Sequence, residues 1–307
     1  MSQVTRPKEE QRPAQEEDFQ PATRRRRWSE RLFRALIIVA TLSGIAVLGV
    51  LIVDVLVDGL PRLSWDFITS FDSQFNPESA GIYPALLGTL WLVVLTTLLT
   101  VPLGIGAAVY LEEYANDNWL TRIVEVNISN LAGVPSVIYG VLALGLFVNY
   151  LGPLTGGSTI ISGALALTLL VLPVIIIAGR EAVRAVPEDV REGAFALGAT
   201  RWEVIWSHVL PMALPGALTG TILALSRAVG ETAPLLVVGA AAYINFAPEG
   251  PQSQFTALPI QIYSWASRPE EAFQVTAAAA GIIVLLVILL SSNSIAIALR
   301  NWLQRRR

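Results

Sequence analysis

The sequence predicts an all-α, polytopic membrane protein with six transmembrane helices, and its composition and charge pattern support this fold class. The chain has 307 residues, of which 53% are hydrophobic and 15% are charged, whereas water-soluble domains carry about 25% charged residues. The apolar residues form long blocks. Asp54 is the one charged residue within 35–57, and no Asp, Glu, Lys or Arg occurs within 79–111, 126–179 or 272–299. Because a spanning helix needs about 20 such residues, the blocks predict membrane spans.

The blocks assign the helices in order along the chain. The block 126–179 is long enough for two spans, and the Gly-Pro-Leu-Thr-Gly-Gly run at 152–157 supplies the turn between them. A fifth span covers about 214–241 and is interrupted by two charged residues. The first, second and sixth spans cover 32–57, a stretch that starts near Ile82, and 273–299.

Two of these spans contain residues that disturb a helix. Pro102, Gly104 and Gly106 predict a bend or an interruption in the second span. The third span contains the Leu-Ala-Gly-Val-Pro-Ser run at 131–136. A loosened backbone in a membrane is tolerated where protein or a water-filled cavity covers it. This run therefore predicts either a packing kink or a break that lines a pathway.

The first outer loop has one local feature. Residues 63–68 predict a short interfacial helix, with Trp65 and Phe67 at the depth of the lipid headgroups.

The basic residues predict how the chain is oriented in a plasma (inner) membrane. Residues 1–30 are rich in Pro, Gln, Glu and Arg and predict a disordered tail. Its run of four arginines at 24–27 directly precedes an apolar span, which favours a topology anchor over a nucleic-acid patch. With the amino terminus inside, Arg62 and Arg268 are outside and Arg227 is within a span, which leaves 18 of the 21 Lys and Arg residues in the cytoplasm. Both termini are therefore expected to be cytoplasmic.

Several absences exclude whole classes of function. Lys8, in the tail, is the sole lysine, so the chain has no phosphate-binding P-loop and cannot be a P-loop ATPase. His208 is the sole histidine and there is no cysteine, so a clustered zinc or transition-metal site is not expected. We expect no enzymatic activity and no cofactor. Energy for transport would have to come from a partner or an ion gradient.

The largest inner loop, about 180–211, predicts a docking surface. It is rich in Ala and Gly, and Pro187 followed by two acidic residues is typical of a helix start. We expect two short helices, 188–197 and 200–207, with Gly198 at the bend. The small residues Gly193 and Ala194 would let a partner approach closely. An ordinary amphipathic surface hairpin is the alternative.

Arg227 and Glu231 form the second notable pattern. They are four residues apart, which places them on one helix face about one turn apart. An arginine near the middle of a span costs about 2.5–3.5 kcal/mol, so such residues face the interior and have partners. The pair is either a neutralised structural bridge or part of an anion pathway in which Glu231 holds Arg227. The planar donors of arginine suit a phosphate-like oxyanion and favour the pathway.

The inner loop resembles the coupling loop by which permease subunits of ATP-driven importers hold their ATPase partner, Glu-Ala-Ala-x3-Gly-x9-Ile-x-Leu-Pro. The positions that match this pattern are Glu192, Ala194, Gly198, Leu210 and Pro211, and those that depart from it are Gly193 and His208.

With that loop, the segment Arg-Ala-Val-Gly-Glu-Thr-Ala-Pro-Leu at 227–235 resembles the A-type permease subunit of phosphate-specific ATP-binding-cassette importers. Its Thr-Ala-Pro-Leu ending is the A-type feature. The resemblance extends over roughly residues 30–305. Further similar stretches are 102–114, 131–139, 184–187 and 196–200.

The resemblance implies a type I ABC importer permease fold over 31–307 and import of inorganic phosphate by alternating access. It implies a C-type sister permease, two ATP-binding-cassette ATPase subunits that bind ATP, and an extracytoplasmic phosphate-binding protein. Acidic outer loops fit delivery by that docked protein, because they would not attract free phosphate; their acids are Asp58, Asp66, Asp72, Glu78, Glu249, Glu270 and Glu271.

Three alternatives remain open at this point. The first is a permease for another oxyanion, such as molybdate or sulfate. The second is a proton-coupled secondary transporter that uses Arg227 and Glu231 as a relay. The third is a membrane scaffold or sensor that transports nothing.

Overall fold

The computed structural model describes residues 24–305, and within this range the chain forms helices and no strand. Most of the tail expected over 1–30 lies outside the described residues. Helix α1 (Arg24–Gly59) begins inside that range, so residues 24–30 are helical. The chain divides into two compact units at Val53, and the second unit, from Asp54 onward, contains all the later helices.

The second unit is built from long apolar helices joined by short ones. The short and π-helical elements are η1 (Leu60–Arg62), α2 (Trp65–Thr69), η2 (Tyr110–Tyr114), η3 (Leu144–Tyr150), α6 (Gly152–Thr155), α8 (Glu188–Ala196), α9 (Arg201–Val204), η4 (Ile205–Val209), α11 (Ala233–Val238), α12 (Leu258–Ala266) and η5 (Ala272–Ala277). The longer ones are α3 (Tyr83–Val109), α4 (Trp119–Ala132), α7 (Ile160–Arg184), α10 (Leu210–Val229) and α13 (Ala278–Arg305). The short helix α5 (Ser136–Ala143) continues directly into η3.

The six predicted spans are confirmed, with one of them bent. Within the described range, five stretches are long and apolar enough to cross a membrane. The sixth is the pair 119–132 and 136–150, whose two parts are bent by 108°. Its break contains Gly133 and Pro135, inside the run where the sequence predicted one.

Two details of the predicted spans differ in the structure. Of the bend or interruption predicted at Pro102, the interruption is wrong, because helix α3 continues through this residue. The fifth span does not run to Ala241, because α10 ends at Val229 and α11 begins only at Ala233. The break contains Gly230, Glu231 and Thr232 and is followed by Pro234, so turn-forming and charged residues mark it in the sequence.

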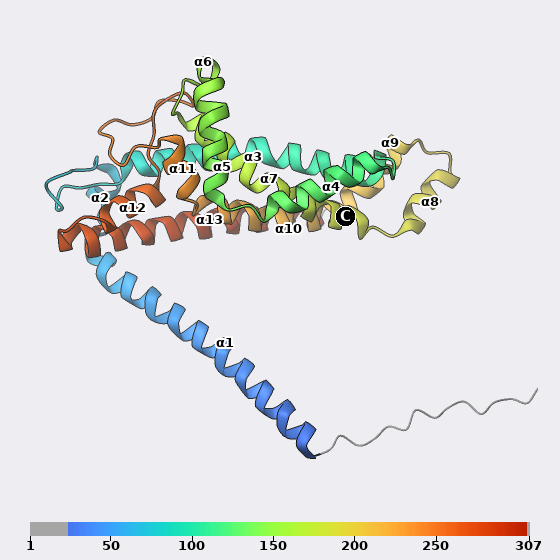
Figure 1. Cartoon of the computed structure of the whole chain (residues 1–307), viewed down its shortest axis with the longest axis horizontal. Helices are drawn as coiled ribbons and strands as arrows, with labels where there is room; N and C mark the ends of the chain where they lie inside the picture. The colour runs from blue at the N-terminus through green and yellow to red at the C-terminus, as the bar shows by residue number, and fades with distance from the viewer. Residues whose placement is uncertain (1–23, 306–307) are drawn as a thin grey trace, which may run out of the picture. The chain divides into compact units, whose positions relative to one another are not determined.

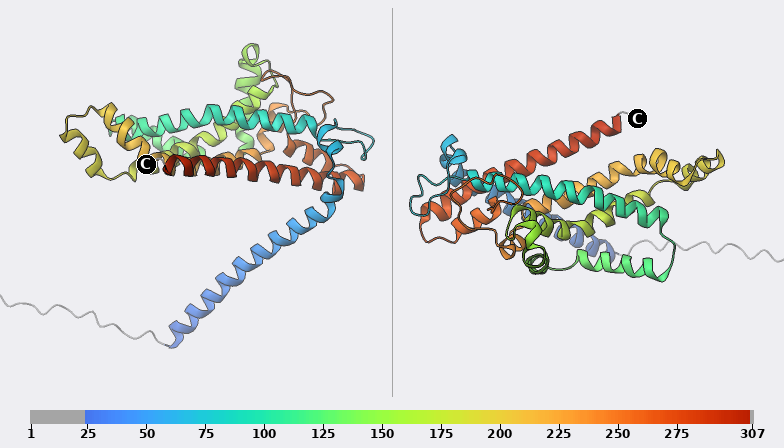
Figure 2. Two further views of the ribbon diagram at one scale, coloured as in Figure 1. Left: turned by 180° about the vertical axis from the view of Figure 1, so that it is seen from behind. Right: turned by 90° about the horizontal axis from the view of Figure 1, so that it is seen from above.

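Helix α7 is the central helix of the second unit. It lies against α3 on one side and α10 on the other, and the three run side by side (Figures 1 and 2). Leu167, Val171 and Ile175 of α7 belong to one buried cluster with Leu92 of α3 and Ala224 of α10. The core of the unit therefore follows α7.

Glycines allow these helices to approach each other. A Cβ atom on Gly104 of α3 would lie 2.5 Å from Cγ2 of Ile175, and one on Gly220 of α10 would lie 2.2 Å from Cβ of Ala178. Carbon atoms in contact need about 3.5–4.0 Å. A larger residue at either position would force the helices apart.

The long helices of the second unit separate two groups of short helices. Helices α8 and α9 lie at one end, which we call the coupling-loop end, and α2 and α12 lie at the opposite end (Figure 1). The segment formed by α5, η3 and α6 stands across the direction of the bundle. Gly156 and Gly157, both with positive φ, follow it and make the turn that the sequence predicted.

We expect Gly104→Ala to lower the free energy of unfolding by about 1–3 kcal/mol, because the added methyl overpacks the contact with Ile175. Gly106→Ala, two residues along α3, is the control, since its Cβ would meet nothing within 4 Å. Thermal unfolding of the purified protein in detergent measures both variants. Equal melting temperatures for the two variants would contradict this account of the packing.

Candidate functional site

The segment after α7 forms the helix–bend–helix arrangement that the sequence predicted. Helix α8 ends at Ala196, Gly198 adopts a left-handed conformation with φ of 85°, and α9 begins at Arg201. Thr200 starts α9 with a capping box: its hydroxyl accepts from the backbone N–H of Glu203, whose carboxylate accepts from the Thr200 N–H at 2.8 Å. Beyond α9 the chain stays helical through η4 into α10.

The predicted coupling residues divide into two groups. Glu192, Gly193 and Gly198 are exposed on the surface of α8 and the bend. Ala194 is buried beneath them, with only 7% of its surface exposed, in a cluster that includes Val183, Val186, Val204 and Val209. The remaining two predicted residues, Leu210 and Pro211, are half-buried at the start of α10.

Leu197 is the most prominent apolar side chain of this surface and was not predicted. It stands directly before the bend and is 91% exposed. The tip of the loop therefore presents an apolar side chain beside the exposed small residues Gly193 and Gly198.

Ion pairs that sequence reasoning missed hold this loop in place. Glu113, at the end of the second span, accepts from Arg191 of α8 at 3.0 and 3.1 Å. The neighbouring Glu112 accepts from Arg180 at 2.7 Å and Arg184 at 2.8 Å. These residues are 68 to 78 positions apart in the chain, so no local spacing could have indicated the pairs.

Arg227 and Glu231 do form an ion pair, at 3.2 Å between Nε and Oε1, but the expected geometry is wrong. Glu231 lies beyond the end of α10, in the turn before α11, and its N–H donates to the carbonyl of Ala228. The two side chains therefore meet across the end of a helix and not along one helix face. The side chain of Arg227 is 58% exposed and that of Glu231 16%.

A line of polar contacts joins α10 to α13 beside this pair. The hydroxyl of Ser226 donates to Oδ1 of Asn293 at 2.6 Å, and Arg300 donates to the hydroxyl of Thr219 at 2.9 Å. The two contacts are seven residues apart on both helices, which is about 10.5 Å along each helix axis. The polar line therefore runs from next to Arg227 toward the coupling-loop end.

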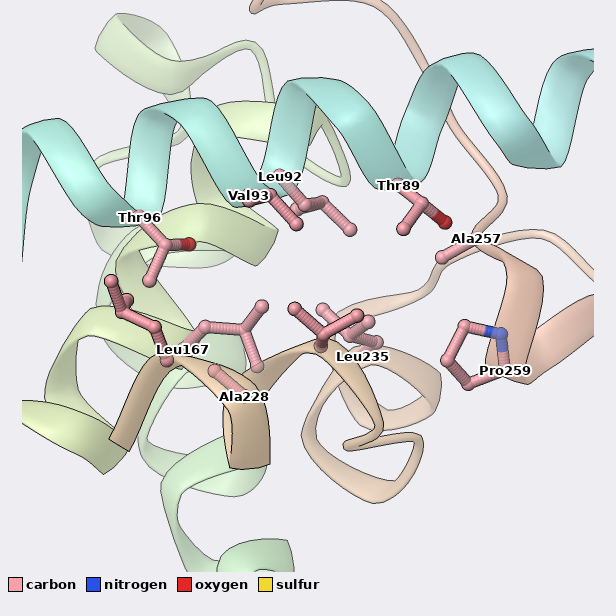
Figure 3. Close-up of a pocket in the computed structure, with 11 residues that line it drawn as sticks. Thr89, Leu92, Val93, Thr96, Leu167, Ala228, Leu235, Ala257 and Pro259 are labelled. Carbon is pink, nitrogen blue, oxygen red and sulfur yellow. The ribbon is translucent and has the colours of Figure 1, made fainter. Parts of the chain in front are cut away.

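A small cavity lies inside the second unit (Figure 3). Its lining is almost entirely apolar and comes from α3, α7, α10, α11 and α12, with Leu92, Leu167 and Leu235 among its residues. It has room for about one water molecule. An apolar space of this size cannot hold an oxyanion, so it belongs to the packing of the core.

The opposite end corrects two expectations. Phe67 is 1% exposed and packs on Trp265 with ring centroids 5.9 Å apart, so only Trp65, at 76% exposure, can lie at an interface. Asp72 is 6% exposed and is not part of an acidic outer surface. Trp265 and Gln261 donate to its carboxylate at 3.0 and 2.9 Å.

Burial raises the pKa of Asp72 above its ordinary value of 3.8, and the hydrogen bonds from Gln261 and Trp265 oppose this shift. Arg268, whose Nη2 is 3.7 Å from the carboxylate, opposes it as well. Arg268 and Arg62 also donate to backbone carbonyls of the loop 73–80. The two arginines assigned to outer loops therefore hold this one loop in place.

The family of the chain follows from comparison with known proteins. Residues 100–307 match the family described as binding-protein-dependent transport system inner membrane component. A probable ABC transporter permease protein, YqgI, from Bacillus subtilis is 37% identical over 224 residues, which cover 72% of each chain. The phosphate transport system permease protein PstA 1 of Mycobacterium tuberculosis is 40% identical over 195 residues, covering 63% of this chain and 62% of that protein.

A longer match and a solved structure agree with this result. The phosphate transport system permease protein PstA of Haemophilus influenzae is 32% identical over 244 residues, covering 80% of this chain and 84% of that protein. A crystal structure of a bacterial alginate ABC transporter, in complex with alginate pentasaccharide-bound periplasmic protein, contains a chain with the same fold. The TM-score is 0.63 at 17% identity, over 91% of this chain and 95% of that one.

The fold, the two-helix loop and these matches define a multi-pass membrane permease. The chain belongs to the family of binding-protein-dependent transport system inner membrane components. It has the type I ABC importer permease fold.

We expect Asp72→Ala to lower the free energy of unfolding by about 2–4 kcal/mol, because Gln261 and Trp265 lose their buried acceptor. The free energy of unfolding of Asp72→Asn should lie between those of the unchanged protein and Asp72→Ala, because asparagine keeps one acceptor oxygen. Glu78→Ala, an exposed change in the same loop, is the control. Thermal melts in detergent compare the variants, and an unchanged melting temperature for Asp72→Ala would contradict the structural role.

Proposed function

We propose that this chain is the permease subunit of an ATP-driven importer that carries inorganic phosphate into the cell. The exposed guanidinium of Arg227, at the end of the apolar helix α10, is the observation that carries the proposal. A charged group within a span faces protein or a water-filled pathway. The names of the Mycobacterium tuberculosis and Haemophilus influenzae relatives support phosphate as the anion.

Arg227 suits a phosphate oxyanion because its donors remain available. Only Nε of the guanidinium donates to Glu231, so the two Nη groups can donate to an anion in a forked geometry. Glu231 fixes the orientation of the guanidinium plane, and its negative charge reduces the positive potential around Arg227. The phosphate anion would then pass along the polar line formed by Ser226, Asn293, Thr219 and Arg300.

The coupling-loop end faces the cytoplasm in this proposal, because 18 of the 21 Lys and Arg residues then lie inside. A binding protein delivers phosphate to the opposite end. Two ATPase subunits that bind ATP dock on the loop around Leu197 and Gly198, and a C-type sister subunit completes the pathway. Closure of the ATPase dimer moves the loop and opens the pathway inward.

Membership of a binding-protein-dependent family favours this mechanism over a proton-coupled secondary transporter. A permease for sulfate or molybdate would use the same arginine, and competition by these anions in the uptake assay separates the substrates. The test of the proposal is reconstitution of the chain with its partner subunits in liposomes. Uptake of radiolabelled phosphate that requires ATP supports it, and accumulation without the ATPase contradicts it.

In that assay we expect Arg227→Gln to reduce phosphate uptake by about tenfold to a hundredfold, because a charge-assisted hydrogen bond is worth about 1.5–3 kcal/mol. Arg227→Lys should keep part of the activity, since it keeps the charge but loses the forked donors. The double variant Arg227→Gln with Glu231→Gln separates the two interpretations of the pair. Restored uptake in the double variant would mean that the pair is only a structural bridge.

The loop has its own prediction. Gly198→Ala should weaken binding of the ATPase subunits several-fold, because a residue with a Cβ is strained by about 1–2 kcal/mol at a φ of 85°. Gly193→Ala is the matched control, since Gly193 is helical and an added Cβ meets nothing within 4 Å in the chain. Co-purification of the ATPase measures both. Equal loss in the two variants would show that small size, and not the bend, is what the partner requires.

A further inference from the structure

Arg191 connects three elements at the coupling-loop end. It lies on α8, on the side opposite the exposed Glu192 and Gly193, and its side chain is 12% exposed. Its guanidinium donates to Glu113 in η2 at 3.0 and 3.1 Å, which joins α8 to the end of the second span. It also donates to the carbonyls of Val183 at 2.9 Å and Val186 at 2.7 Å, which lie in and just after the last turn of α7.

These contacts satisfy groups that would otherwise be costly. The last carbonyls of a helix have no partner within the helix. Arg191 supplies a donor to the carbonyl of Val186 and a second donor to that of Val183, which also accepts from the N–H of Val186 at 3.2 Å. The side chain of Glu113 is only 10% exposed, so its charge needs a close partner. The guanidinium of Arg191, a residue of α8, therefore donates to carbonyls at the end of α7 and neutralises the carboxylate of Glu113, which follows α3.

The apolar contacts beneath α8 are less suited than the ion pair to fix the orientation of α8 against the long helices. They involve small side chains, Ala194 and Val186, packed with Val204. Apolar packing is not directional, whereas the planar guanidinium fixes both the distance and the orientation of its partners.

The adjacent carboxylate holds the rest of this end together. Glu112 accepts from Arg180 and Arg184 of α7, and Arg180 also donates to Glu125 of α4 at 2.5 Å. Glu112 and Glu113 lie side by side in the π-helical turn η2 but bind arginines of different elements. Glu112 therefore ties α3 to the bundle, and Glu113 ties it to the loop.

We propose that the Arg191–Glu113 ion pair is the joint that makes α8 move as one body with α3 and α7 when the ATPase moves the loop. This inference rests on the function proposed above. Arg191 and Glu113 are positioning residues, which contact neither the transported anion nor the nucleotide. Without the joint, ATP hydrolysis continues but moves less substrate per ATP.

The first test measures phosphate uptake and ATP hydrolysis together in the reconstituted importer. We expect Arg191→Gln and Glu113→Gln each to lower the phosphate moved per ATP by about tenfold while the complex still assembles. Arg191→Lys should recover part of this ratio, because it restores the charge. Arg122→Gln, which changes an arginine of α4 near the same end that lies outside the joint, should leave the ratio unchanged.

Two results of this test would overturn the proposal. One is an unchanged ratio in an assembled Arg191→Gln importer. The other is loss of assembly in both Arg191→Gln and Arg191→Lys, which would assign the pair to the folding of the loop alone.

A second test does not depend on phosphate. The chain contains no cysteine, so spin labels can be attached at Asp189→Cys in α8 and Asp117→Cys beyond η2 without background. With the joint intact, the distance between the labels should stay constant between the nucleotide-free and ATP-bound complex, and Arg191→Gln should make it change. A distance that changes equally in both proteins would overturn the joint, whereas failed phosphate uptake with the expected distances would overturn only the proposed function.

Discussion

The close contact of α7 with both α3 and α10 is the constraint on which the rest of the structure depends. Gly104 and Gly220 make it possible, since a Cβ atom at either position would overlap α7. Because the three helices have one relative placement, the groups at their ends meet reproducibly: Glu113 of η2 reaches α8, and Arg227 at the end of α10 stands beside the polar line to α13. The apolar core thus sets where the polar groups at the helix ends can meet.

Three arginines of the second unit are enclosed by neighbouring elements at the two ends of the bundle. Arg180 and Arg191 at one end, and Arg268 at the other, are largely buried and donate to carboxylates or backbone carbonyls of neighbouring elements. Arg184 and Arg227 are more exposed, at 57% and 58% of their side chains. Arg184 ends α7 at the coupling-loop end, whereas Arg227 lies at the other end of the apolar helix α10. A structural arginine in a membrane protein would be enclosed by its partners. The exposure of Arg227 at the end of an apolar helix is therefore the observation behind its proposed role in transport.

Local patterns in the sequence predicted the features that depend on neighbouring residues, such as helix starts and bends. Gly198, Pro187 and Thr200 are turn and cap residues, so the two helices of the loop and the bend between them could be located from the sequence alone. The end of α10 at Val229 was placed too late by hydropathy, although Gly230, Glu231 and Pro234 mark the break before α11. The Arg191–Glu113 pair could not be located from the sequence, since a contact over 78 residues depends on which helices lie side by side.

The separation between buried and exposed residues in α8 links these observations to mechanism. One side of this short helix presents Glu192 and Gly193, which are free to meet a partner, and the other presents Arg191 and Ala194 to the protein interior. A force applied to the first side must pass through the second to reach the membrane helices. Packing against a small residue such as Ala194 tolerates sliding, whereas an ion pair with a 10% exposed carboxylate resists displacement in every direction. In the proposed mechanism, the directional Arg191–Glu113 contact, and not the larger apolar one, carries movement of the loop into the bundle.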